Sequence, residues 1–399
     1  MQVVYVPDQP PRSYSKSIFL AGPSPRPGQP ESLNWRPEAL ATLERLGFDG
    51  VVFVPLPENG DWRHGYDSQI GWELQNLDRA DQIVFWVPRS AALPALTTNI
   101  EYGRFFDSGR AVLGYPEDAP NMRYLALTGK DESVPVAHTL EETLQEAIKR
   151  IGNGATRTAG ERDVPLNIWR LPHFQGWYRS QTGAGNRLDG AKVLWTFRVG
   201  PGKSYTFGFI LHVNVFIQAE KRNKINEFVF ARPDIATVVG YRRPFRGIAA
   251  PRLQDTEIAI IREFRSPART SDGFIREIPG GSSWKPGDDP FVTMTHELEE
   301  ETGLGPLSGF TIAPSRLRKV GARQLCGTLS VHQAHVFACE LTDREMGFLK
   351  QEQANNTAHG VEADTERTYV EVHRLGDLLK ADSDLLDWSM LGQILTALS

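Results

Sequence analysis

The chain has 399 residues, which is too long for one ordinary domain and predicts two or three domains. Its composition, 40% hydrophobic and 23% charged with a net charge of −5, excludes disordered, collagen-like and coiled-coil proteins and a broadly basic nucleic-acid-binding surface. Because the chain has two cysteines, no apolar run of about 18 residues and no signal-peptide pattern, we expect a cytoplasmic protein that does not enter a membrane.

The first 152 residues alternate short apolar runs with helical patterns, which predicts a parallel sheet covered by helices on both faces. The expected strands are Ile18–Ala21, Val51–Val54, Ile83–Val87, Ala111–Gly114 and Tyr124–Leu127. The expected helices lie around Pro37–Leu46, Ser68–Arg79, Asn99–Ser108 and Thr139–Ile151. We therefore predict a doubly wound α/β domain over residues 1–152, with its ligand beyond the carboxyl ends of the strands.

The next segment, residues 153–193, begins with small polar residues and continues into an aromatic-rich stretch without a clear period. This composition predicts a linker or a bridging segment. From about residue 194 strand patterns dominate, and one strong helix, Phe291–Thr302, interrupts them. That order predicts an α+β domain over residues 194–399.

The predicted helix at Phe291–Thr302 carries Glu297, Glu300 and Glu301 at positions i, i+3 and i+4, on one helix face. Three crowded carboxylates repel one another unless a cation neutralises them, and hard oxygen ligands suit Mg²⁺ or Mn²⁺. The plainer interpretation is a solvated acidic face. The preceding strand and Pro-Gly-Gly loop favour a metal site instead.

The region from Gly281 to Leu304 resembles the signature of the Nudix hydrolase family. The upstream segments EIAIIREFRSP and REIPGG resemble the ADP-ribose pyrophosphatase branch of that family. The resemblance covers roughly Trp195 to Leu379 and implies an α+β domain with a mixed sheet.

This resemblance also implies roles for individual residues. It implies that the metal ligands are Glu297, Glu300, Glu301 and the carbonyl of Gly280. Contacts to the nucleotide or its pyrophosphate would come from Arg265 and Glu277. A carboxylate from a late loop would act as base, which we assign to Glu366, with Glu362 and Asp364 as alternatives.

Two positions depart from the Nudix pattern. Asp288 stands where the family has Glu, after six residues from Gly281 rather than five, and His296 replaces an Arg. A histidine does not supply the permanent, forked guanidinium of arginine. The domain is therefore either a working pyrophosphatase, which we favour, or a module that binds an ADP-ribose-like ligand without hydrolysing it.

Polar residues in the first domain follow the predicted strands. Gly22 and Ser24 lie in a turn after the first strand, with Arg26 nearby, where a phosphate or a sugar hydroxyl could bind. Carboxylates cluster around the third strand, namely Glu73, Asp81 and Glu101. Two or three carboxylates around one crevice suit glycosidic bond chemistry, although Asp81 alone could simply cap the strand that follows it.

The motifs FLAGP, QIGWE, ADQIVFW and TTNIEYG resemble, in order and approximate spacing, those of the nucleoside 2-deoxyribosyltransferase family and its N-glycosidase relatives. This resemblance covers about Ser17–Leu127. It implies that Glu101 is the nucleophile that forms a covalent ribosyl-enzyme, that Glu73 is the acid/base, and that Asn99 positions the nucleophile. Typical members have Asp at the position of Glu73.

Together these patterns predict a bifunctional nucleotide-processing enzyme. The first domain, without a cofactor, would cleave or transfer an N-glycosidic bond in a nucleotide such as NAD. The second, with Mg²⁺ or Mn²⁺, would hydrolyse a product such as ADP-ribose. Two alternatives remain: a first domain that acts independently on nucleoside 5′-monophosphates, or a second domain that senses an ADP-ribose-like ligand and regulates the first. We expect a homodimer whose ligands are small nucleotides, with neither nucleic acid nor membrane as partner.

Overall fold

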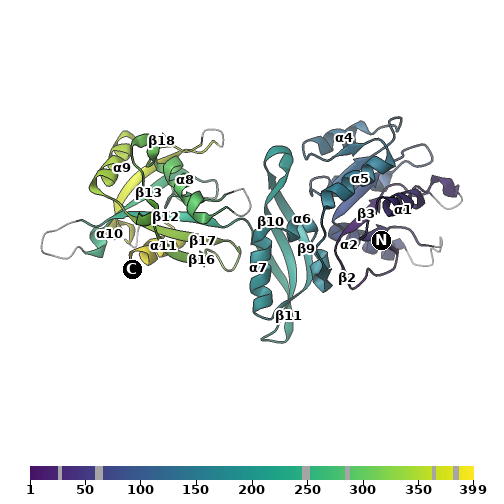
Figure 1. The fold of residues 1–399 in the computed structure, drawn as a ribbon, viewed down its shortest axis with the longest axis horizontal. Coiled ribbons are helices and arrows are strands. Elements are labelled where there is room, and N and C mark those ends of the chain that lie inside the picture. Colours follow the sequence, from purple (N-terminus) through teal and green to yellow (C-terminus); the bar gives the residue numbers. More distant parts are fainter. Residues whose placement is uncertain (26–28, 59–65, 245–251, 284–287, 362–364, 381–385) are drawn as a thin grey trace. The chain divides into compact units, whose positions relative to one another are not determined.

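The computed structural model describes the chain except for residues 26–28, 59–65, 245–251, 284–287, 362–364 and 381–385 (Figure 1). It divides into two compact units, Met1–Ala231 and Arg232–Ser399. The division lies well after residues 153–193, which the sequence suggested as a linker.

The first unit contains a six-stranded sheet in the order β1-β4-β3-β5-β6-β7, and every pairing in it is parallel. Its strands are β1 (Gln2–Tyr5), β3 (Ser17–Ala21), β4 (Val51–Val54), β5 (Gln82–Trp86), β6 (Ala111–Gly114) and β7 (Val136–Ala137). Four of the five predicted strands are therefore confirmed, and the α/β class of this region with them.

Helices cover both faces of this sheet. The core on one face includes residues of α1 (Arg36–Arg45) and α5 (Leu140–Ile151). The core on the other face includes residues of α2 (Tyr66–Arg79), α3 (Leu96–Phe105) and α4 (Arg123–Lys130). Successive residues of a strand pack into opposite cores, because their side chains point alternately to the two faces of the sheet. This two-sided burial explains why the strands are apolar throughout.

The fifth predicted strand, Tyr124–Leu127, is wrong, because these residues lie in α4. Tyr124 and Leu127 are 79% and 54% exposed, whereas Leu125 is buried, as on an amphipathic helix. In an apolar run of four residues, the spacing of the apolar side chains does not distinguish a helix from a strand. The sheet position beside β6 belongs instead to β7.

Residues 153–193 do not form a simple linker. They contain β8 (Arg157–Thr158), α6 (Leu166–Trp169), α7 (Pro172–Gly183) and the start of β9 (Arg187–Val199). Strand β9 then joins β10 (Tyr205–Ile217) and β11 (Arg222–Ala231) in an antiparallel sheet of the first unit. Phe174 of α7 is fully buried and packs against Phe209 of β10. The strands expected from residue 194 onward are present, but the first three belong to this unit.

The second unit is built on an eight-stranded mixed sheet. Strands β12 and β17 pair in parallel, and the other pairs are antiparallel. The strands are β12 (Ile235–Arg242), β13 (Glu257–Phe264), β14 (Phe274–Glu277), β15 (Gly280–Gly281), β16 (Arg318–Gln324), β17 (Gln333–Glu340), β18 (Ala358–His359) and β19 (Thr368–Arg374). The expected α+β character of this region is thus present.

Two pairs of helices contribute to the two cores of this second sheet. Residues of α8 (Pro290–Thr302) and α9 (Asp343–Asn355) belong to one core, and residues of α10 (Leu375–Leu378) and α11 (Trp388–Leu398) to the other. The predicted helix at 291–302 is confirmed as α8. Asp289 caps it by accepting from the Phe291 N–H, and Gly303 ends it with a φ of +69°.

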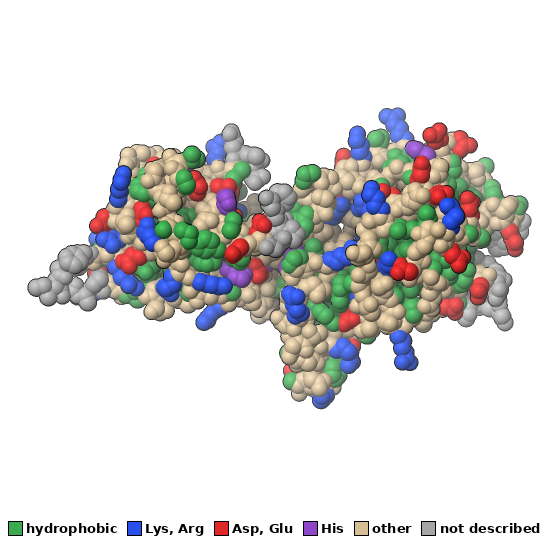
Figure 2. All heavy atoms as spheres, in the orientation of Figure 1, with side chains coloured by type: hydrophobic (Ala, Val, Ile, Leu, Met, Phe, Trp, Pro, Cys, Tyr) green, Lys and Arg blue, Asp and Glu red, His purple; other side chains and the backbone are tan. Residues whose placement is uncertain are grey.

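The surface seen in Figure 2 carries interspersed basic and acidic side chains on each unit. Such mixing fits the near balance of 44 Lys and Arg against 49 Asp and Glu. Within the described ranges, no helix combines the length and the apolar composition needed to cross a membrane.

Candidate functional site

Three helices of the first unit bring charged side chains to the carboxyl edge of the parallel sheet. Helix α1 follows β3, α2 follows β4 and α3 follows β5, while β3 lies between β4 and β5 in the sheet. The chain therefore crosses from β4 on one side of β3 to β5 on the other, the arrangement at which doubly wound sheets bind ligands beyond the strand ends. Arg36 on α1, Glu73 on α2 and Glu101 on α3 interact electrostatically with one another.

Glu73 and Glu101 form a pair of half-buried carboxylates. The pKa of Glu101 is raised to about 7, first by burial and then by the negative charge of Glu73, against the lowering effect of Arg36. Burial also raises the pKa of Glu73, which a hydrogen bond from Gln69 Nε2 (2.7 Å) and the charge of Arg36 counteract. Near neutral pH this pair can hold one proton and one negative charge, as an acid and a nucleophile require.

The turn after β3 contains Gly22 and Ser24, both expected to bind substrate. Gly22 has a φ of +154°, and a Cβ there would lie 2.2 Å from the carbonyl oxygen of Trp86. Only glycine fits this close approach. Arg36 donates to the Gly22 carbonyl oxygen (2.8 Å) and to Ser24 Oγ (3.0 Å), so the turn adjoins the carboxylate pair. Arg26, also expected to bind substrate, lies outside the described residues.

Asn99 stands near the start of α3 and is held by Arg89. Its Oδ1 accepts a hydrogen bond from Arg89 Nη2 at 2.5 Å, and Arg89 Nη1 donates to the carbonyl oxygen of Asn121 at 3.1 Å. Burial lowers the pKa of Arg89. The predicted positioning residue is thus itself fixed, two residues before Glu101.

Asp81 does not join this group, and its assignment as a catalytic residue is corrected. It directly precedes β5, at the amino end of the strand and away from the ligand edge. Both of its oxygens accept from the Arg157 guanidinium, at 2.7 and 2.6 Å, and both side chains are buried. Ser17 Oγ and the Leu166 N–H also donate to it. Asp81 therefore has a structural role.

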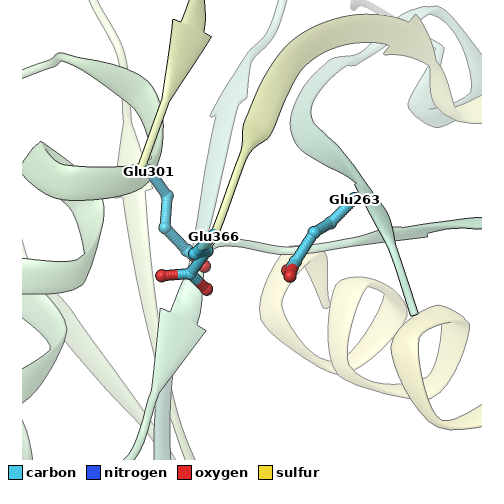
Figure 3. Close-up of side chains that lie close together, drawn as sticks. All are labelled: Glu263, Glu301 and Glu366. Atoms are coloured by element: carbon cyan, nitrogen blue, oxygen red, sulfur yellow. The ribbon is translucent and has the colours of Figure 1, made fainter. Parts of the chain in front are cut away.

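The second unit gathers carboxylates from three segments of the chain. Glu263 in β13, Glu301 in α8 and Glu366 shortly before β19 place an oxygen each within 4.8 Å of one another. Figure 3 shows Glu301 and Glu366 side by side, with Glu263 pointing toward them. The pKa of Glu263 is raised to about 7, mainly by burial, and that of Glu301 is raised well above its usual range by burial and by Glu297.

Such a cluster is unfavourable without a cation, because buried carboxylates cannot all ionise together. A divalent ion with oxygen ligands fits this donor set. Arg265 supplies a nearby positive charge, with its guanidinium 2.8 Å from Glu263 and 3.1 Å from Glu277. The two residues expected to contact a nucleotide, Arg265 and Glu277, are therefore brought together at this cluster.

The segment Gly280–Gly281 contacts two glutamates of α8 that were predicted as metal ligands, Glu301 and Glu297. The Gly280 N–H donates to Glu301 at 2.7 Å, and a Cβ on Gly281 would lie 2.2 Å from the Glu297 carboxylate. The pKa of Glu297 is raised to about 7 by burial, Glu300 and Glu366. The side chain of Glu300 is exposed and is not one of the three converging carboxylates. Of the expected metal ligands, Glu301 is therefore one of the three converging carboxylates, whereas Glu297, Glu300 and Gly280 are not. The other two members are Glu263 and Glu366, the second of which was predicted as a base, and the metal site itself stays a prediction.

The two residues that depart from the Nudix pattern, Asp288 and His296, both lie at the surface. His296 is exposed on α8, and Asp288 accepts a hydrogen bond from Ser283 Oγ at 2.5 Å. Neither belongs to the three converging carboxylates. The sequence reasoning missed Arg36 and Glu263. For Glu263 a signal existed, namely a second acidic residue in the strand EIAIIREF, beyond its apolar centre.

The comparisons with known proteins bear on the first unit. Residues 15–119 match the model of a family described as nucleoside 2-deoxyribosyltransferase like. This span contains Arg36, Glu73 and Glu101 together with the Gly22–Ser24 turn. A search of curated proteins found no match for the chain.

Proposed function

We propose that the first unit breaks or transfers the N-glycosidic bond of a nucleoside or nucleotide, with Glu101 as nucleophile and Glu73 as acid/base. The observation that carries this proposal is the pairing of these two carboxylates, which interact electrostatically with each other and with Arg36, in a segment that matches an enzyme family of glycosyl transfer. Paired carboxylates with separated roles are the usual means of breaking a glycosidic bond.

The chemistry balances with these residues alone. In the reactive form of the pair, Glu73 holds the shared proton and Glu101 is ionised. Glu101 attacks the anomeric carbon, the C1′–N bond breaks, and Glu73 gives its proton to the departing base. The covalent ester at Glu101 then reacts with water or with a second base. Glu73 takes the proton of that acceptor, and both carboxylates return to their initial states.

The test is to incubate the full-length protein, without divalent ions, with nucleosides, nucleoside 5′-monophosphates and NAD, and to identify the products by mass. We expect a free base from at least one class, and a new nucleoside or nucleotide when a second base is added if transfer occurs. If NAD is a substrate, the first unit produces ADP-ribose, on which the second unit could act. If 5′-monophosphates are the substrates, the two units act independently of each other. No base release from any class would contradict the proposal.

For the second unit we propose hydrolysis of a pyrophosphate bond in a nucleoside diphosphate derivative such as ADP-ribose, as in Nudix enzymes. Glu263, Glu301 and Glu366 would hold a divalent cation, which would supply positive charge for the phosphate oxygens. The converging carboxylates, the Gly-Gly segment against α8 and the mixed sheet support this proposal. Arg265 would bind and orient an anionic group beside the cluster.

Replacing Glu301 by glutamine is expected to remove most of the response to Mg²⁺. In the native protein Mg²⁺ should raise the unfolding temperature of one calorimetric transition, because it relieves carboxylate repulsion in the folded state only. AMP should form from ADP-ribose in the presence of Mg²⁺. Both effects should be lost in Glu301→Gln and retained in Glu299→Gln, a neighbour outside the three converging carboxylates.

The outcomes separate the two candidate roles of this unit. AMP formation that depends on Glu301 supports a pyrophosphatase. Tight binding of ADP-ribose without turnover would favour the sensor, for which the exposed His296 in place of arginine is the specific observation. Native protein that neither binds ADP-ribose nor responds to Mg²⁺ would contradict both.

A further inference from the structure

We infer that Arg36 is a positioning residue of the glycosidic site, which fixes the Gly22–Ser24 turn through its hydrogen bonds and at the same time supplies positive charge that acts on Glu101. The inference rests on the proposed function of the first unit and deepens it. It concerns the residue that orients the site, whereas Glu101 and Glu73 carry out the chemistry.

The first observation is the position of the guanidinium. Arg36 is 1% exposed, and its side chain donates to four acceptors at the carboxyl end of β3. These are the carbonyl oxygens of Leu20 (3.2 Å), Gly22 (2.8 Å) and Pro23 (3.5 Å), and Ser24 Oγ (3.0 Å). One planar group thus joins the last residues of a central strand to the turn that follows it.

The second observation is that these hydrogen-bond acceptors are all neutral. A fully buried positive charge is costly unless negative charge lies near it. Burial lowers the pKa of Arg36 to about 10, and the carboxylates that oppose this effect are Glu101 first and Glu73 second. The Arg36 charge is therefore shared by two carboxylates.

The same interaction acts on the nucleophile in return. The charged groups that shift the pKa of Glu101 are Glu73, which raises it, and Arg36, which lowers it. Loss of the Arg36 charge would leave burial and Glu73 unopposed, so more of Glu101 would be protonated at neutral pH. The guanidinium fork would also no longer tie Ser24 to Gly22, which would loosen the turn.

The test compares Arg36→Gln with Arg36→Lys in the full-length protein. Glutamine keeps hydrogen-bond donors but removes the charge, whereas lysine keeps the charge but removes the fork. Infrared difference titration, with Glu101→Gln as the reference, reports the protonation of the Glu101 carboxyl without relying on activity. The pH profile of base release is recorded in parallel.

We expect the titration midpoint of Glu101 to rise by about one pH unit or more in Arg36→Gln and to stay close to the native value in Arg36→Lys. Activity at the optimum pH should fall by about tenfold or more in the lysine variant, because the turn is no longer fixed. A role in folding alone would lower activity at every pH without moving the midpoint.

An unchanged midpoint in folded Arg36→Gln would overturn the inference. If that variant does not fold, Arg36→Lys decides, since native activity in it would show that the fork positions nothing. The failure of the proposed function is a distinct result: native protein that releases no base, whatever the titration of Glu101 shows.

Discussion

Replacing Glu101 by glutamine is expected to slow base release by at least about 10³-fold, because the amide cannot form the covalent ester with the sugar. Glutamine has nearly the size of glutamate, so the fold should be retained. The rate is measured in a single turnover by separating the free base. Acid quenching of the native reaction should also trap a sugar attached to the protein, and the variant should yield none.

The matched control for this variant is Glu44→Gln, which changes an exposed glutamate on α1. It should release base at the native rate. Glu73→Gln should lie between the two, with a larger loss for bases that leave poorly, because these most need a proton. Native turnover by Glu101→Gln would show that another group attacks the sugar.

The raised pKa of Glu101 adds a dependence on pH to this first prediction. Only the ionised carboxylate attacks, and the folded protein holds the Glu101 proton up to about pH 7. The rate of ester formation should therefore fall as the pH decreases through 7, well above the usual value of 4.5. An acid limb near pH 4.5 would contradict the environment described for Glu101.

Asp81→Asn is expected to destabilise the first unit by about 3–5 kcal/mol, because it leaves the buried guanidinium of Arg157 without its counter-charge. The amide can replace only part of the bidentate contact. The change should lower the unfolding temperature of one of the two units in calorimetry of the full-length protein. Its direct effect on catalysis should be small wherever the variant is folded.

The control for Asp81 is an exposed ion pair in the same unit. Arg45 and Glu141 make contacts of 2.9 Å that are as close as many buried ones, yet both side chains are largely exposed. Glu141→Gln should change the unfolding temperature little, since solvent screens such pairs. If Asp81→Asn were as stable as Glu141→Gln but inactive, the result would support a catalytic role for Asp81 in place of the structural one.

The strands and the paired carboxylates of the first unit could be anticipated because their signals are local. Each strand is an apolar run next to a helix pattern, and Glu101 stands in a helix motif that follows β5 after a loop. The partner of Asp81 could not be anticipated, because Arg157 lies 76 residues later in a segment without a periodic pattern. Arg36 belongs to no motif, and its importance comes from the carbonyl groups around it.

In the second unit the helix with its carboxylates was predictable, but the set of converging residues was not. Adjacent Glu300 and Glu301 differ by about 100° around the helix, so one points to solvent when the other points to the sheet. Glu263 and Glu366 reach the same place only through the pairing of β13 with β19. Sequence spacing alone contains no information about that pairing.

The contact between Arg157 and Asp81 limits how far the first unit can be shortened, or moved into another protein, without losing stability. The span that matches the family, residues 15–119, includes Asp81 but lacks Arg157, and with it Val164 and Leu166, which contact this pair. A chain cut at residue 152 would keep Glu73 and Glu101 but leave Asp81 without the positive charge of Arg157. A fragment intended to fold by itself, or to be fused to another protein, should therefore extend to Ala231, where the compact unit ends.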